Sequence, residues 1–130
     1  GQSVYFQQPS SLSAVLNRVT GRDPSQILGS LGSNGRVWLL NPQGVLFGRD
    51  ARVDVAGLVA STLSIADADW AAGRYRLFDE GAGGLLLNQG ELRSASGGQI
   101  LLVGGSAGVR NEGLIHAPGG QVMLAAGHTV

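Results

Sequence analysis

The sequence predicts an all-β chain that folds as a parallel β-helix, a solenoid of stacked coils with about 23 residues in each. One observation is an internal repeat, because the segment that begins at Asn88 is nearly repeated 23 residues later from Asn111. A unit this short cannot close a core of its own, so it buries its apolar face against neighbouring coils. The other observation is the apolar alternation at Ile100 and Leu102, which has the period of a strand with one buried face.

The two copies of the repeat match at corners and at strand positions. The matched pairs are Asn88/Asn111, Gly90/Gly113, Leu92/Ile115, Gly97–Gly98/Gly119–Gly120, Gln99/Gln121, Ile100/Val122 and Leu102/Leu124. The 22 glycines of the chain recur with this repeat and do not form one low-complexity tract. We therefore interpret the paired glycines as coil corners, where the backbone needs a positive φ or a close approach.

Length and composition fit a single domain over residues 1–130. Nine Arg balance nine Asp and Glu, and this neutrality argues against a nucleic-acid partner, which needs a basic surface. Cysteine is absent, so neither disulfides nor a thiolate metal site can form. No run of 18 apolar residues occurs, so we expect no membrane span. We also expect no cofactor.

The first half of the chain divides into short strands separated by turn residues. Strands are expected at residues 2–6, 14–19, 37–40, 45–47, 53–55 and 58–63. Residues 22–29 begin with Asp-Pro and end with Gly, which predicts a helical turn or short helix. Tight turns are expected at Ser33–Gly35 and at Asn41–Gly44, which are rich in Asn and Gly.

Residues 64–78 break the coil pattern. This segment has mixed charge and gathers Trp70, Tyr75 and Phe78. We interpret it as an excursion outside the helix, packed on the flank of the stack, with a helical turn at residues 68–72. Regular coils are expected to resume at Leu85 and to run to the end of the chain.

Four asparagines recur near the coil period. They are Asn17, Asn41, Asn88 and Asn111, at intervals of 24, 47 and 23 residues. The middle interval is close to two coils, with one member missing inside the excursion. We therefore predict a structural column of asparagines at one corner, at least for the last three, with each amide bonding the backbone of an adjacent coil. At Asn17 the pattern allows a slip of one residue.

Motifs for catalysis are weak, and we expect neither a catalytic site nor a metal site. Ser106 lies in a Gly-x-Ser-x-Gly pattern, but another coil follows it and no Asp lies downstream, so a turn is the better interpretation. The acidic residues near the excursion are interleaved with arginines, which favours surface ion pairs over the carboxylate pair of a glycosidase. His116 and His128 lack a third ligand for a metal.

The two tryptophans have different expected roles. Trp38 falls in the middle of an apolar strand and is expected to be structural. Trp70 lies in the excursion, where a structural contact and a candidate glycan contact agree equally well with the sequence.

Several blocks of the chain resemble the filamentous haemagglutinin-type two-partner secretion (TPS) domain. They are Ala14–Leu31, Asn34–Gly48 and Gly57–Leu63, and Ala71–Phe78 is similar to the segment that follows in that family. The likeness covers nearly the whole chain. It implies a right-handed parallel β-helix at the amino end of a large exported bacterial protein, usually an adhesin, haemagglutinin or contact-dependent toxin.

The resemblance also implies partners and a location. A dedicated outer-membrane β-barrel transporter would recognise the domain through its periplasmic POTRA modules, and the exoprotein would pass through the periplasm to be secreted or held on the cell surface. The rest of the exoprotein would contact a host-cell or biofilm glycan. The family's Asn-Pro-Asn-Gly motif falls on Asn41, Pro42, Gln43 and Gly44, so these residues are the candidate signal corner for transporter recognition. Compared with the family, the chain is expected to lack its N-terminal capping coils.

We therefore expect a non-enzymatic secretion and folding-nucleation domain of an adhesin-like exoprotein. One alternative is a carbohydrate-binding or carbohydrate-cleaving β-helix, in which Trp70 and the acidic residues of the excursion face a groove. A second alternative is a purely structural rod. That interpretation predicts that deletion of the domain leaves export intact.

Overall fold

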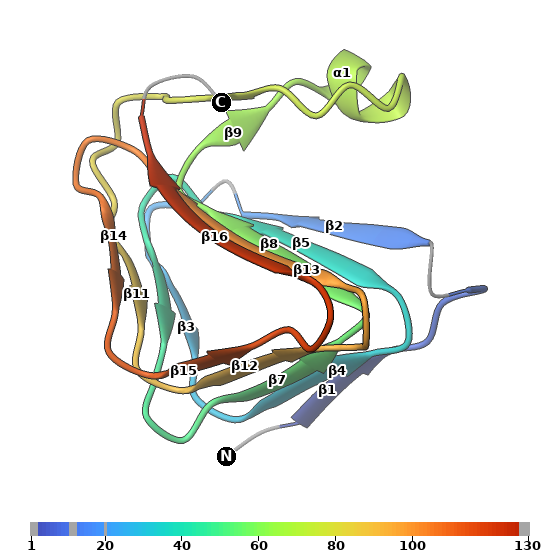
Figure 1. Ribbon diagram of the computed structural model, residues 1–130. Helices are drawn as coiled ribbons and strands as arrows, with labels where there is room; N and C mark the ends of the chain where they lie inside the picture. The colour runs from blue at the N-terminus through green and yellow to red at the C-terminus, as the bar shows by residue number, and fades with distance from the viewer. Residues whose placement is uncertain (1–2, 11–12, 20, 128–130) are drawn as a thin grey trace.

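The computed structural model describes residues 3–10, 13–19 and 21–127. Within them the backbone winds repeatedly through three parallel sheets and gives a roughly triangular cross-section (Figure 1). Sheet A contains β1 (Ser3–Phe6), β4 (Ser30–Ser33), β7 (Arg52–Val55), β12 (Glu91–Ser94) and β15 (Leu114–His116). Sheet B contains β2 (Ala14–Arg18), β5 (Arg36–Leu40), β8 (Gly57–Ser61), β13 (Gln99–Gly104) and β16 (Gln121–Ala126). Sheet C contains β3 (Ser25–Ile27), β6 (Val45–Phe47), β11 (Leu86–Asn88) and β14 (Val109–Asn111).

Each coil takes one strand from sheet A, then one from sheet B and one from sheet C. We number the coils by these strands: coil 1 is β1, β2 and β3; coil 2 is β4, β5 and β6; coil 3 is β7, β8 and β11; coil 4 is β12, β13 and β14. In sheet B, Leu102 of coil 4 pairs with Ala60 below it and with Leu124 above it. The predicted parallel β-helix, with repeated positions stacked in files, is confirmed.

The core lies inside the triangle, and every second residue of a strand points its side chain into it. In β5, Val37 and Leu39 point into this core, as the period of a strand requires. The alternate residues, Trp38 and Leu40, belong to a second apolar cluster on the opposite face of sheet B. Both faces of β5 are therefore buried, which a bare solenoid would not provide.

An insertion at residues 62–85 leaves coil 3 between β8 and β11 and covers the outer face of sheet B. It contains β9 (Ser64–Ile65), the short helix α1 (Asp67–Ala71) and β10 (Leu77–Phe78), and β9 and β10 pair in antiparallel fashion. The predicted excursion and helical turn are confirmed, although the segment outside the coil is longer than residues 64–78. At the same corner, coils 2 and 4 need just the short turns Asn41–Gly44 and Gly105–Gly108.

The predicted helical turn at residues 22–29 is wrong, because this stretch contains β3. The N–H of Ser25 donates to the carbonyl of Gly44 at 3.0 Å, and the N–H of Gly48 donates to the carbonyl of Ile27 at 2.9 Å. A single helical turn gains few internal hydrogen bonds for the backbone freedom it loses. The parallel ladder with β6 offers more, so Asp23 and Pro24 belong to a coil corner and do not cap a helix.

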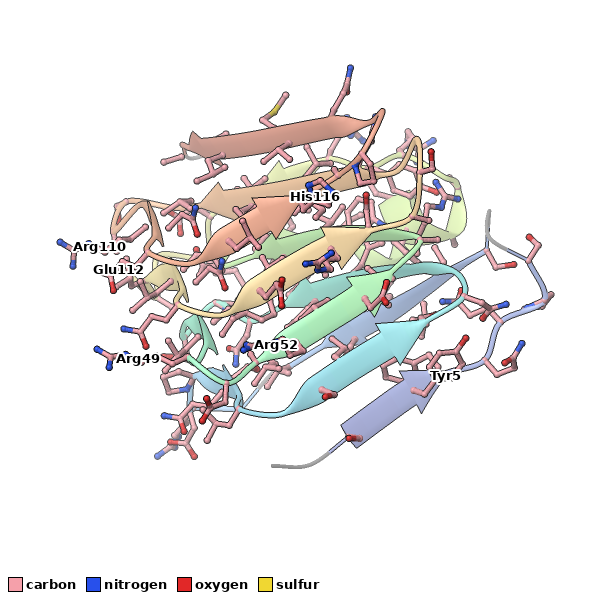
Figure 2. The ribbon with its side chains drawn as sticks, turned by 60° about the horizontal axis from the view of Figure 1, so that its bottom comes forward. Tyr5, Arg49, Arg52, Arg110, Glu112 and His116 are labelled. Atoms are coloured by element: carbon pink, nitrogen blue, oxygen red, sulfur yellow. The ribbon has the colours of Figure 1, made fainter. Side chains whose placement is uncertain are left out.

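The outer face of sheet A is polar and carries ion pairs within and between coils. Arg52 lies 3.2 Å from Glu91 across β7 and β12, and Arg93 approaches the same carboxylate to 2.6 Å. Figure 2 shows this face, with Tyr5 on the first strand of the sheet and His116 on the last. Among the described residues, no helix is long and apolar enough to cross a bilayer.

Candidate functional site

The candidate signal corner, Asn41–Gly44, joins β5 to β6 in a tight turn. The N–H of Gly44 donates to the carbonyl of Asn41 at 3.1 Å, and the N–H of Gln43 donates to Asn41 Oδ1 at 3.0 Å. Such a turn suits Pro42, whose ring fixes φ, and Asn41, whose short side chain can accept from the backbone. Gly44 has a φ of 138°, a conformation that strains other residues. These four residues therefore define the turn locally.

Asn41 also links this turn to coil 1. The residue is 0% exposed, and its Nδ2 donates to the carbonyl of Asp23 at 3.0 Å and to Ser25 Oγ at 2.9 Å. The amide nitrogen and oxygen therefore both have partners, as a buried side-chain amide requires. In the folded domain the corner is a joint between coils 1 and 2.

Gln43 departs from the family's Asn without disturbing the turn. Its backbone N–H makes the hydrogen bond to Asn41, and none of the described residues other than glycine has a positive φ. The left-handed conformation that favours Asn is therefore not needed at this position. The half-buried side chain of Gln43 lines a pocket of about 220 Å³ together with Arg18 and Glu80.

The insertion returns to sheet C directly against this corner. The N–H of Gly84 donates to the carbonyl of Pro42 at 3.2 Å, and the N–H of Val45 donates to the carbonyl of Leu85 at 3.0 Å. A methyl group on Gly84 would overlap the backbone of Gln43 and Gly44. Sequence reasoning missed this contact, and the glycine pair that ends at Gly84, just before β11, is the signal that could have located it.

Aromatic rings attach the insertion to sheet B. The ring centroids of Trp38 and Trp70 are 5.3 Å apart, and those of Trp38 and Tyr75 are 4.9 Å apart. Trp70 is half-buried in this cluster. The packing supports the structural interpretation of Trp70, and no observation on the described residues supports a glycan contact through it.

Charged side chains hold the insertion at two further points. Arg18 of coil 1 donates to the carbonyl of Ile65 at 2.9 Å and forms a salt bridge with Asp67. Within the insertion, Asp69 accepts from Arg76 at 2.9 Å and from Arg74 at 3.1 Å. These two hydrogen bonds, that of Arg76 first, hold the pKa of the Asp69 carboxyl below its usual value.

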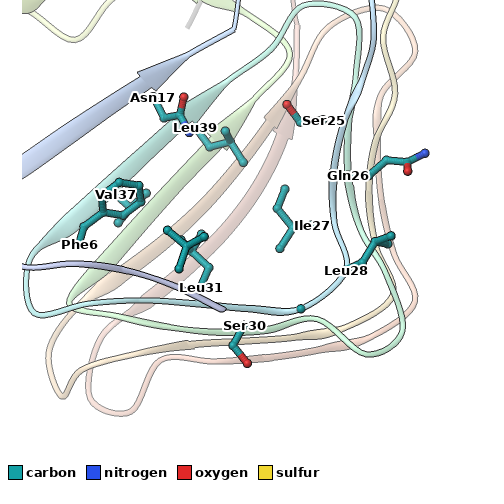
Figure 3. Close-up of a pocket in the computed structure, with 12 residues that line it drawn as sticks. Phe6, Asn17, Ser25, Gln26, Ile27, Leu28, Ser30, Leu31, Val37 and Leu39 are labelled. Atoms are coloured by element: carbon teal, nitrogen blue, oxygen red, sulfur yellow. The ribbon is translucent and has the colours of Figure 1, made fainter. Parts of the chain in front are cut away.

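The prediction of one asparagine column is wrong, because the four residues lie at three places in the coil. Asn88 and Asn111 do stack in register at the corner from sheet C to sheet A, with Asn88 Nδ2 donating to Asn111 Oδ1 at 2.9 Å. Asn41 lies at the corner from sheet B to sheet C. Asn17 pairs with Leu39 within sheet B and lines a cavity of about 290 Å³ at the N-terminal end of the coil interior (Figure 3).

The remaining sequence candidates are dispersed over the surface. Ser106 is exposed in the turn Gly105–Gly108, and His116 is exposed on β15. His128 lies outside the described residues. Within residues 3–10, 13–19 and 21–127, no group of three or more His, Cys, Asp or Glu could hold a metal ion.

Comparison with known proteins assigns the family. A family model for the TPS secretion domain matches residues 1–130. The chain belongs to the TPS secretion domain family. The TPS domain is also similar to a solved structure, the HMW1 secretion domain from Haemophilus influenzae, with 37% sequence identity and a TM-score of 0.94. That match covers 98% of this chain and 34% of the other.

Two curated relatives share a shorter segment with this TPS domain. Both are heme/hemopexin-binding proteins of Haemophilus influenzae, one of them from strain Rd, and they are 49% and 46% identical over 61 residues. The match covers 47% of this chain but 7% of each relative. The expected family, fold and role in secretion are therefore confirmed. The names of the two relatives describe ligands of far longer proteins, of which this chain matches a small part.

Proposed function

We propose that this TPS domain carries the export signal and the folding nucleus of a large, secreted, adhesin-like exoprotein. A dedicated outer-membrane β-barrel transporter binds the domain through its periplasmic POTRA modules while the chain is still extended. The exoprotein then reaches the cell surface or the medium. Membership of a secretion-domain family supports this role and supports a domain that acts without catalysis.

The burial of Asn41 is the observation that carries the proposal. Asn41 is 0% exposed, and its amide is bonded within the turn and to coil 1. A partner cannot contact this side chain once coils 1 and 2 have closed. Recognition of the signal corner therefore precedes folding, and β-strand addition is the mode that suits an extended chain.

The test compares Asn41→Ala with the matched control Asn88→Ala. Both asparagines are 0% exposed and both bond an adjacent coil, so the two variants lose similar structural contacts. We expect export of the Asn41→Ala exoprotein to fall severalfold below that of Asn88→Ala in cells that carry the transporter. Equal losses in both variants would restrict the corner to a structural role.

The carbohydrate alternative gains no support from the described residues, because Trp70 packs against Trp38 and Tyr75. We assign any contact with a host-cell or biofilm glycan to the rest of the exoprotein. Deletion of residues 1–130 distinguishes the structural-rod alternative, since export then continues if the domain is merely a rod. We expect export to stop.

A further inference from the structure

We propose that the transporter's strand binds one edge of the segment from Pro42 to Phe47, and that residues Gly84–Asn88 later displace it from that edge. This inference rests on the proposed function and adds the surface that is recognised and the event that ends recognition. The surface is a row of backbone groups, and the partner is an extended strand of a POTRA module.

The row of backbone groups is visible in the bonds that the returning chain makes. The carbonyl of Pro42 accepts from Gly84 at 3.2 Å, the N–H of Val45 donates to Leu85 at 3.0 Å, and the carbonyl of Phe47 accepts from Gln89 at 2.7 Å. The Val45 N–H and the Phe47 carbonyl lie on one edge of β6, and the Pro42 carbonyl adds an acceptor from the turn that precedes the strand. Any extended peptide in the right register can satisfy them.

The opposite edge of β6 is already occupied by an earlier part of the chain. Ser25 pairs with Val45, and Ile27 pairs with Phe47. When the chain has emerged up to residue 47, the strand for the opposite edge is already present, whereas the strand for this edge, β11, has not yet emerged. An open strand edge with unpaired N–H and C=O groups readily accepts another strand.

The insertion postpones the closure of this edge. Coils 2 and 4 turn from sheet B to sheet C with four residues, 41–44 and 105–108, whereas coil 3 uses the 24 residues from 62 to 85. Gly84 comes 40 residues after Gly44, so a chain that emerges in order presents the edge well before its final partner arrives. A loop of this length raises the entropic cost of closure only modestly, so displacement is delayed but not prevented.

The inward side chains define what a competing strand must carry. Val45 and Phe47 are almost fully buried, and Leu86 lies in register with Val45. A transporter strand on this edge should therefore place an apolar residue opposite Val45. The competing strand must also have a glycine at the position equivalent to Gly84, because a side chain there would overlap the backbone of the corner.

A cysteine lock tests the competition directly, because the natural chain has no cysteine. Leu46 and Leu87 pair in register on β6 and β11, so oxidised Leu46→Cys/Leu87→Cys ties the displacing segment to the edge. Leu87→Cys/Arg110→Cys ties the same strand to β14 and is the matched control. The oxidised chains are unfolded in urea and diluted into purified POTRA modules of the cognate transporter, and the captured fraction is measured.

We expect oxidation of the Leu46/Leu87 pair to lower capture about tenfold, because the tether raises the effective concentration of the competing strand. Reduction should restore capture, and oxidation of the Leu87/Arg110 pair should leave the captured fraction unchanged. Equal capture of the oxidised and reduced Leu46/Leu87 chains would overturn the inference. A wild-type chain that the modules never capture would instead overturn the proposed function.

A glycine pair supplies a second test that needs no disulfide. Gly84→Val blocks the return of the insertion to the edge, whereas Gly120→Val obstructs stacking at Gly98, in a distant coil. We expect the POTRA modules to dissociate about tenfold more slowly from Gly84→Val than from Gly120→Val, since displacement is lost in the first variant alone. Equal dissociation rates for the two variants would contradict the displacement.

Discussion

The paired glycines at the corner from sheet A to sheet B have two different tasks. The first of each pair has a positive φ, 78° at Gly97 and 65° at Gly119. The second does not, but it lies against the backbone of the coil below: a methyl group on Gly98 would overlap the carbonyl of Ala56, and one on Gly120 would overlap the carbonyl of Gly98. One glycine therefore sets the turn, and the next sets the spacing between coils.

Gly98→Ala should destabilise the domain by about 1–3 kcal/mol, because the added methyl group forces two coils apart. Gly127→Ala is the matched control, since no atom of the described residues lies within 4 Å of a methyl group at that position. The free energy of unfolding in urea, followed by far-ultraviolet circular dichroism, measures both effects. Equal stabilities for the two variants would contradict the assigned spacing role.

Spacing along the sequence predicted these glycine corners but failed for the asparagines. In the structure Asn88 pairs with Phe47, which lies 41 residues earlier, so one coil here contains the insertion. The insertion adds nearly one coil length, and the count from Asn41 to Asn88 therefore looked like two regular coils. Residue spacing alone cannot distinguish an extra coil from an insertion, since both add about the same number of residues.

At the scale of elements, the insertion converts the outer face of sheet B into a second core. Leu63, Ile65 and Leu77 are each less than 5% exposed, and they pack with Leu40 of β5. This explains why the strand expected at residues 58–63 is too long: Leu63 continues the apolar pattern but belongs to the insertion. The charges and aromatic residues of the sequence predicted the excursion. They did not predict which sheet face it covers, because that contact joins residues far apart in the sequence.

Trp70→Ala should lower the free energy of unfolding by about 2 kcal/mol. This is less than the loss expected for a fully buried Trp, because the ring of Trp70 is partly exposed. The loss arises from the contacts with Trp38 and Tyr75. Trp70→Phe retains an aromatic ring and should lose much less. Urea unfolding of the three proteins measures the difference, and identical midpoints would show that the aromatic cluster adds no stability.

The carboxylate of Asp69 gives the insertion a pH dependence. Its pKa is lowered in the folded state by hydrogen bonds from Arg76 and then Arg74. A lowered folded pKa stabilises the fold above the unfolded pKa, and this stabilisation is lost as the pH falls below about 4 towards the folded value. We expect the protection factors of the amides in residues 67–77, which are corrected for the pH dependence of intrinsic exchange, to fall over that range, and Asp69→Asn to remove this change. An unaltered pH dependence in Asp69→Asn would assign it to other groups.

At the scale of the whole molecule, the insertion connects coils that are not neighbours. It contacts Arg18 in coil 1 and Trp38 in coil 2, and Thr62 Oγ1 accepts from the N–H of Gly105 in coil 4 at 3.1 Å. A simple solenoid has contacts between adjacent coils only, so its end coils can open independently. The repeat predicted the winding of the chain, but nothing in the repeat predicts this cross-connection.

Replacement of residues 62–85 by the four-residue corner Asn-Pro-Gln-Gly should keep the β-helix and weaken this coupling. Coil 1 loses its tie through Arg18, so the amides of β2 should exchange at least about tenfold faster relative to those of β13. Hydrogen exchange resolved by segment measures the ratio. A ratio equal to that of the natural chain would show that adjacent-coil contacts alone hold coil 1.

Both tryptophans of the chain lie where the insertion meets sheet B. Their emission therefore reports a single event, the docking of the insertion, while circular dichroism reports the winding of the coils. Two optical signals recorded in one stopped-flow refolding experiment consequently give the order of these events without any added label. A lag between them would time the interval during which the edge of β6 is still available to a partner.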